Sequence, residues 1–152
     1  MAPEELLKNI AEILSELKIP YAITGGFAVS VWGNPRSTAD IDIVVELIDK
    51  NVKPLIEKVL VLNSDFYVDE DMAKDAIIHK SEFNFIDPDT GLKIDFFIMD
   101  NTPYNKLKIK RAILRDVAGA KALFVSPEDL ILGKLNWSKE SYSQKQHNDI
   151  KT

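Results

Sequence analysis

The stretch GGFAVSVWGNPRSTADIDIVV, residues 25–45, joins a glycine pair to a strand that carries two aspartates. Alternate side chains of a strand point to opposite faces, so Asp40 and Asp42 share one face and the isoleucines beside them share the other. At a rise of about 3.3 Å per residue, their backbones lie about 7 Å apart. Two carboxylates at that spacing can reach a common cation or a pair of cations, and without cations they repel each other.

A third acid of interest lies in KIDFFI, residues 93–98, where Asp95 stands among strongly apolar neighbours. Burial of an unpaired carboxylate is costly, so such a residue is usually paired, placed at a water-filled edge, or bound to a metal. If its strand lies beside the Asp40 strand, three carboxylates converge in the oxygen-rich environment that Mg²⁺ prefers. The alternative is that Asp40 and Asp42 lie on the solvated face of an edge strand and Asp95 is an isolated salt-bridged residue. Together with the glycine turn, the three aspartates favour the metal site.

The remaining sequence alternates between helical and strand patterns. Apolar spacing and turn residues predict helices over 3–18, 27–32, 49–62 and 70–78 and from Ser126, and strands over 21–24, 40–46, 66–68, 82–86, 92–99 and 120–125. The segment DPDTG, residues 87–91, has the residues of a hairpin turn, so the strands on either side of it should be antiparallel. Residues 104–119 are ambiguous. The order predicts an α+β fold, a mixed β-sheet flanked by helices, with residues 1–152 as a single domain.

Composition excludes several classes of function. The chain has 152 residues and 0 Cys, which excludes disulfides, zinc–thiolate sites and cysteine nucleophiles. The net charge of −5 argues against a general nucleic-acid binder. The first eighteen residues lack the apolar run of a signal peptide or membrane span, so we expect a cytoplasmic protein with no membrane partner. One basic stretch is more typical of a solvated face than of a binding patch: Lys106, Lys108, Lys110, Arg111 and Arg115.

Lys134 is a separate candidate in the helix that begins with Ser126. At about 100° per residue, it falls between Leu130 and Ile131 on the apolar side of that helix. Such a lysine either packs its stem on the core while its ammonium reaches water, or binds an anion. Geometry alone leaves both interpretations open.

Residues 25–45, with Arg36 and Thr38 between the glycines and the aspartates, resemble the signature of the DNA polymerase beta-type nucleotidyltransferase superfamily. In that signature a glycine turn precedes a D-x-D strand, and KIDFFI resembles the third acidic strand. The closest resemblance is to stand-alone bacterial and archaeal members related to AbiEii and MenT-type toxins, from about Tyr21 to Asp149. It implies a nucleotidyltransferase fold, metals (Mg²⁺ or Mn²⁺) on Asp40, Asp42 and Asp95, and a nucleotide site formed by Gly25, Gly26, Arg36, Thr38, Lys134 and Asp149.

The function that follows is the transfer of a nucleoside monophosphate from a nucleoside triphosphate to an unidentified acceptor, which could be RNA, protein or a small molecule. One alternative is a toxin that modifies tRNA or a protein and is controlled by a cognate antitoxin. Another is a non-catalytic nucleotide-binding adaptor that retains the fold. The 152 residues contain no added domain for gripping nucleic acid, so we expect either a small acceptor or a second chain that supplies the grip.

Overall fold

The computed structural model describes residues 3–25, 40–100, 102–117 and 119–131. Its helices are α1 (Pro3–Glu16), the 3₁₀ turn η1 (Asp49–Asn51), α3 (Val52–Leu62), α4 (Glu70–His79) and α5 (Pro103–Lys110). Its strands are β1 (Tyr21–Thr24), β2 (Asp40–Val45), β3 (Glu82–Ile86), β4 (Lys93–Ile98), β5 (Ile113–Val117) and β6 (Ala120–Phe124). The strands form one sheet in the order β3-β4-β2-β1-β6-β5. The β2–β4 and β1–β6 pairs are parallel and the others antiparallel, so the sheet is mixed and the predicted α+β fold is confirmed.

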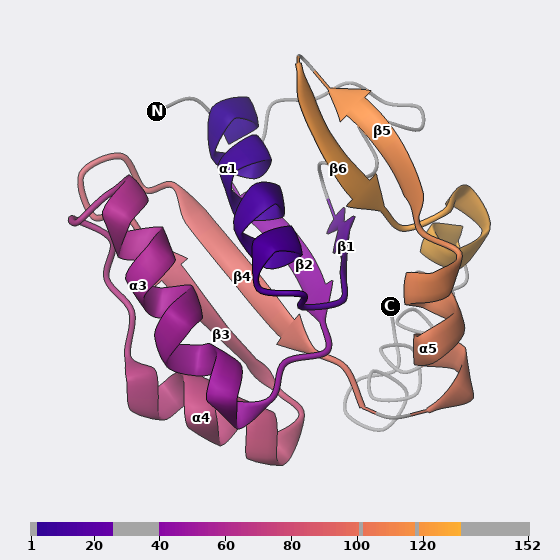
Figure 1. Ribbon diagram of the computed structural model, residues 1–152, viewed down its shortest axis with the longest axis horizontal. Coiled ribbons are helices and arrows are strands. Elements are labelled where there is room, and N and C mark those ends of the chain that lie inside the picture. The colour runs from indigo at the N-terminus through magenta and orange to yellow at the C-terminus, as the bar shows by residue number, and fades with distance from the viewer. Residues whose placement is uncertain (1–2, 26–39, 101, 118, 132–152) are drawn as a thin grey trace, which may run out of the picture.

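Helices α1, α3 and α4 lie over one face of this sheet (Figure 1). Strands β2 and β4 alternate between buried and half-buried positions, as the period of a strand requires. Their buried residues share one apolar core with the helices: Ile41, Ile43, Val45, Ile94, Phe96 and Ile98 from the strands, and Leu6, Ile10, Leu14, Leu55 and Val59 from the helices. The alternate residues, including the aspartates, therefore lie on the face away from these helices.

Several predicted elements have different bounds in the structure. The first helix ends at Glu16, because Lys18 adopts a left-handed conformation with φ 57° and closes the helix ahead of Pro20. The predicted strand over 66–68 is reduced to one bridge between Tyr67 and Ile86. The predicted helix over 27–32 lies outside the described residues.

The ambiguous segment over 104–119 resolves into a helix and a strand, α5 and β5. Thr102 caps α5 by accepting a hydrogen bond from the backbone N–H of Asn105, and Pro103 occupies its first turn. The predicted cap at Ser126 is confirmed, since its hydroxyl accepts from the backbone N–H of Asp129 at 3.2 Å. Within the described ranges, none of the helices has the length and apolar character needed to span a bilayer.

Candidate active site

The two acidic strands are parallel neighbours. In their register Asp42 lies opposite Asp95, and Asp40 lies opposite Lys93. Because paired residues of adjacent strands point to the same side of a sheet, all four side chains share the face away from the helix layer. The structure therefore brings together the three aspartates that the sequence analysis selected.

Lys93 is the residue of this group that sequence reasoning missed. Its ammonium lies 3.4 Å from Asp95 Oδ2 and 4.0 Å from Asp40 Oδ2, and the charge of Asp95, followed by that of Asp40, helps raise the pKa of Lys93. The available signal was its position two residues before Asp95, on the same face of one strand. In this structure a lysine, placed between two carboxylates, supplies the positive charge of the cluster.

Asp42 is the most perturbed member of the cluster. Burial raises its pKa to about 6, with further increases from the charge of Asp95, a hydrogen bond to Asp95 and the charge of Asp40. Lys93 opposes these effects only in part. A carboxylate in such surroundings gains stability from a proton or from an added cation.

The glycine turn meets the carboxylates at Gly25, directly after β1. Gly25 has φ +70°, and a Cβ built on it would lie 2.1 Å from Asp42 Oδ2. No side chain fits there, so glycine at this position lets the backbone approach the carboxylate closely. Thr24 pairs with Asp42 in register, which places the end of β1 at the same row of the sheet.

The remaining predicted nucleotide-binding residues lie outside the described part of the chain: Gly26, Arg36, Thr38, Lys134 and Asp149.

The aspartate cluster offers the carboxylate oxygens that hard divalent cations such as Mg²⁺ and Mn²⁺ take as ligands. Over residues 3–25, 40–100, 102–117 and 119–131, no three Asp, Glu, His or Cys side chains are arranged so that they could hold a metal ion together. Instead the Lys93 ammonium stands beside Asp40 and Asp95 as a positive charge. The chemistry of these carboxylate oxygens suits a divalent cation, which would have to displace Lys93 from Asp40 and Asp95 to bind them.

Replacing Asp42 by Asn is expected to raise the melting temperature of the cation-free protein. The pKa of Asp42 is about 6 in the folded protein and near 3.8 when unfolded, so folding is favoured by its protonation and loses stability as pH rises from about 4 to about 6. Asn carries no charge and imitates the protonated form. Allowing for solvent screening, we expect a gain of about 1 to 2 kcal/mol above pH 6.

The measurement is thermal unfolding in chelator from pH 4 to pH 8. The difference between variant and parent should be near zero at pH 4, grow as pH rises through about 6 and level off at about pH 7. The control is Asp65→Asn, because Asp65 is exposed and lies outside the cluster. A difference that is independent of pH, or that shrinks as pH rises, would contradict the assignment.

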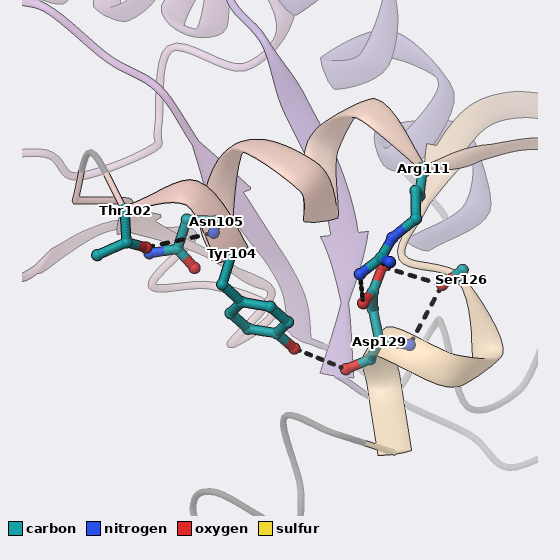
Figure 2. Close-up of polar contacts among 6 residues, drawn as sticks. All are labelled: Thr102, Tyr104, Asn105, Arg111, Ser126 and Asp129. Atoms are coloured by element: carbon teal, nitrogen blue, oxygen red, sulfur yellow. Dashed lines mark hydrogen bonds and ion pairs between the residues drawn. The ribbon is translucent and has the colours of Figure 1, made fainter.

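A second polar cluster joins α5 to the residues that follow β6 (Figure 2). The side chain of Asp129 is fully buried and accepts hydrogen bonds from the Arg111 guanidinium through both Nε and Nη2. The Ser126 hydroxyl donates to Asp129 Oδ2 at 3.1 Å, and the Tyr104 hydroxyl donates to the Asp129 carbonyl at 3.5 Å. The cluster ties together segments 18 residues apart in the chain.

This cluster corrects part of the interpretation of the basic stretch as a solvated face. Arg111 is half exposed but clamped on a buried carboxylate. Lys108 lies 5.2 Å from the centre of the Tyr104 ring, and burial lowers its pKa. Lys106 and Lys110 are exposed, as predicted. Sequence spacing could not separate these lysines from Arg111, because the partner acid comes from a later segment.

No protein-family model and no curated protein matches this chain. Several solved structures, in contrast, are similar to it. The candidate nucleotidyltransferase TM1012 from Thermotoga maritima is similar with a TM-score of 0.62 at 16% identity, over 97% of this chain and 93% of that one. The chain has the nucleotidyltransferase fold.

Two further structures with this fold are antibiotic adenylyltransferases. The lincosamide antibiotic adenylyltransferase LnuA, bound to lincomycin, has a TM-score of 0.55 at 16% identity over 86% of this chain and 85% of its own. ANT(2'')-Ia in complex with adenylyl-2''-tobramycin has a TM-score of 0.56 at 20% identity, over 90% and 76%. At these sequence identities the structural similarity shows a shared nucleotidyltransferase fold and does not extend to the substrate.

Proposed function

We propose that the protein is a nucleotidyltransferase that moves a nucleoside monophosphate from a nucleoside triphosphate to an acceptor, with Asp40, Asp42 and Asp95 as the carboxylates of its active site. The observation that carries this proposal is the in-register pair Asp42 and Asp95, with the backbone of Gly25 against Asp42. The nucleotidyltransferase fold supports it, as do similar structures that are adenylyltransferases of antibiotics. A non-catalytic adaptor could have the same fold, so the proposal depends on the arrangement of the site residues rather than on the fold.

The chemistry is an attack by an acceptor hydroxyl oxygen on the α-phosphorus of the triphosphate. The new O–P bond forms as the bond from the α-phosphorus to the bridging oxygen breaks, and pyrophosphate leaves with that electron pair. Asp95 takes the hydroxyl proton, because its carboxylate lies beside Asp42 and is largely shielded from water. Divalent cations held by Asp40, Asp42 and Asp95 would neutralise charge on the phosphates.

The glycine turn would hold the triphosphate. Backbone N–H groups at Gly25 and Gly26 have no side chains to keep phosphate oxygens away. Because Gly25 lies against Asp42, phosphates on this turn lie next to the cluster. Arg36, Thr38, Lys134 and Asp149 are proposed to complete the nucleotide site on the basis of the sequence resemblance.

The direct test is pyrophosphate release from each labelled nucleoside triphosphate with Mg²⁺ or Mn²⁺, with total RNA or a cell lysate as the source of acceptor. We expect transfer of label that Asp95→Asn lowers at least 100-fold, because the variant lacks the proton acceptor. The matched control is Asp65→Asn, which should be as active as the parent. Absence of release and of label in every fraction would favour the adaptor instead.

Divalent cations are expected to stabilise the parent protein selectively. An ion bound only by the native state adds about 2.7 kcal/mol at 100 times its dissociation constant, which corresponds to several degrees in a domain of this size. Thermal unfolding in Mg²⁺, Mn²⁺ and ionic-strength-matched Na⁺ measures the effect. Asp40→Asn should reduce the response, and Asp65→Asn should keep it. Equal melting curves in all three salts would contradict the metal site.

A further inference from the structure

The face of the sheet away from the helices carries a polar row that crosses four strands. Register places Thr24 of β1 opposite Asp42 of β2, Asp42 opposite Asp95 of β4, and Asp95 opposite Asn84 of β3. The row begins at the glycine turn and ends on β3, beyond the last aspartate. Thr24 and Asn84 have no role in the proposed reaction, and of these two Asn84 is the one that lies beside Asp95.

The geometry of in-line displacement indicates which end of this row faces the triphosphate and which end faces the acceptor. The attacking oxygen and the departing pyrophosphate lie on opposite sides of the α-phosphorus. With the triphosphate on the turn at Gly25, the leaving group lies on the β1 side and the attacking hydroxyl lies on the Asp95 side. The body of the acceptor then extends from Asp95 over β3.

We propose that Asn84 binds the acceptor, and that the acceptor is a small hydroxyl-bearing molecule, neutral or cationic, seated over β3 and β4. This inference rests on the proposed nucleotidyltransferase function. The Asn84 amide offers two donors and one acceptor oxygen, which suit hydroxyl and amine groups next to the one that reacts. It is half-buried and makes no side-chain hydrogen bond to any described residue.

The position of Asn84 is fixed from the opposite face of β3. Phe83 and Phe85 point into the core, where Phe83 stacks on Phe96 with ring centres 5.3 Å apart and Phe85 meets Phe96 edge to face at 5.8 Å. Aromatic pairs of this kind hold neighbouring strands in one register. Asn84 therefore keeps its place beside Asp95 without a polar partner of its own.

Charge on the same face selects the class of acceptor. Glu82, exposed, and Phe97, half-buried, form the next row, opposite each other across β3 and β4. The one cation in these two strands is Lys93, and Asp40 and Asp95 already engage it. Binding of a nucleic-acid backbone needs lysine or arginine for its phosphates, and β3 and β4 present a carboxylate and an aromatic surface instead.

The test uses tobramycin as a cationic polyol, trehalose as a neutral one, and a short RNA oligonucleotide. Isotope-labelled protein gives side-chain amide signals in NMR, and the pair lost in Asn84→Ala identifies Asn84. We expect tobramycin or trehalose at millimolar concentration to shift that pair, and the RNA to leave it unchanged. Shifts by the RNA alone, or by none of the probes, would overturn the inference.

The second readout is kinetic. Pyrophosphate release is measured with whichever polyol shifts the NMR signals of the Asn84 side-chain amide. Asn84→Ala should raise KM for the polyol about tenfold while KM for the triphosphate stays within about twofold, and Asn84→Gln should recover part of the loss. Asn51→Ala, at a half-buried asparagine in η1, is the matched control. Equal polyol KM values in Asn84→Ala and the parent would overturn the role of Asn84 and leave the transfer reaction standing. Release that total RNA or lysate elicits and no polyol elicits would overturn this inference and leave the transfer reaction standing. Release that survives in Asp95→Asn, or that no acceptor of any kind elicits, would remove the proposed function and this inference with it.

Discussion

Gly25→Ala is expected to lower transfer at least 1,000-fold and to destabilise the fold by about 3 kcal/mol or more. An alanine with φ +70° is strained by about 1 kcal/mol. The larger effect is steric, because the new Cβ would lie 2.1 Å from Asp42 Oδ2 and 2.9 Å from Asp42 Cγ. Asp42 must leave its place opposite Asp95, or β1 must move away from β2. Pyrophosphate release and urea unfolding measure the two effects.

Gly91 is a matched control for this substitution. It has φ +75°, and nothing lies within 4 Å of the point that a Cβ would occupy, so Gly91→Ala should show the backbone strain alone. We expect a loss of about 1 kcal/mol and full activity for that variant. Adding Asp42→Ala to Gly25→Ala should recover most of the lost stability and none of the activity. If Gly25→Ala matched Gly91→Ala in both measurements, close approach of Gly25 to Asp42 would have no consequence for the site.

The strands of the site could be predicted because their side chains alternate without interruption. In DIDIVV and KIDFFI, each polar residue falls two positions from the next, so the shared face of Asp40 and Asp42 follows from one strand. The order of strands in the sheet does not follow from alternation. Parallel pairing of β2 with β4, which sets Lys93 beside Asp40, joins residues more than fifty positions apart. For that reason the aspartates were predicted and their counter-charge was missed.

Other parts of the chain were ambiguous for a local reason. Strand β5 is an edge strand in which Leu114 is 62% exposed, so it lacks the regular burial pattern that marked β2 and β4. The roles of Gly26, Arg36, Thr38, Lys134 and Asp149 stay predictions, because these residues lie outside the described ranges. The relation to AbiEii and MenT-type toxins, and with it a cognate antitoxin, also stays a prediction.

Arg111→Ala is expected to destabilise the protein by about 3 kcal/mol. Removing one partner of a buried ion pair leaves an uncompensated charge, at a typical cost of about 3 to 5 kcal/mol. We take the lower end because Arg111 itself is half exposed. Asp129 has no exposed side-chain surface. Without Arg111 its carboxylate would therefore stay buried as a charge, stabilised by the hydrogen bond from the Ser126 hydroxyl but not by an ion pair. Urea unfolding at neutral pH gives the free energy directly.

The two halves of this pair should behave differently, because one partner can reach water and the other cannot. In Asp129→Asn the guanidinium can turn to solvent, so we expect a smaller loss of about 1 to 2 kcal/mol. Arg111→Lys should fall between the parent and Arg111→Ala, since an ammonium cannot reproduce the paired donors of a guanidinium. Lys110→Ala, next to Arg111 and exposed, is the control and should stay within about 0.5 kcal/mol of the parent. A larger loss for Asp129→Asn than for Arg111→Ala would mean that packing of Asp129, rather than its burial as a charge, gives the cluster its stability.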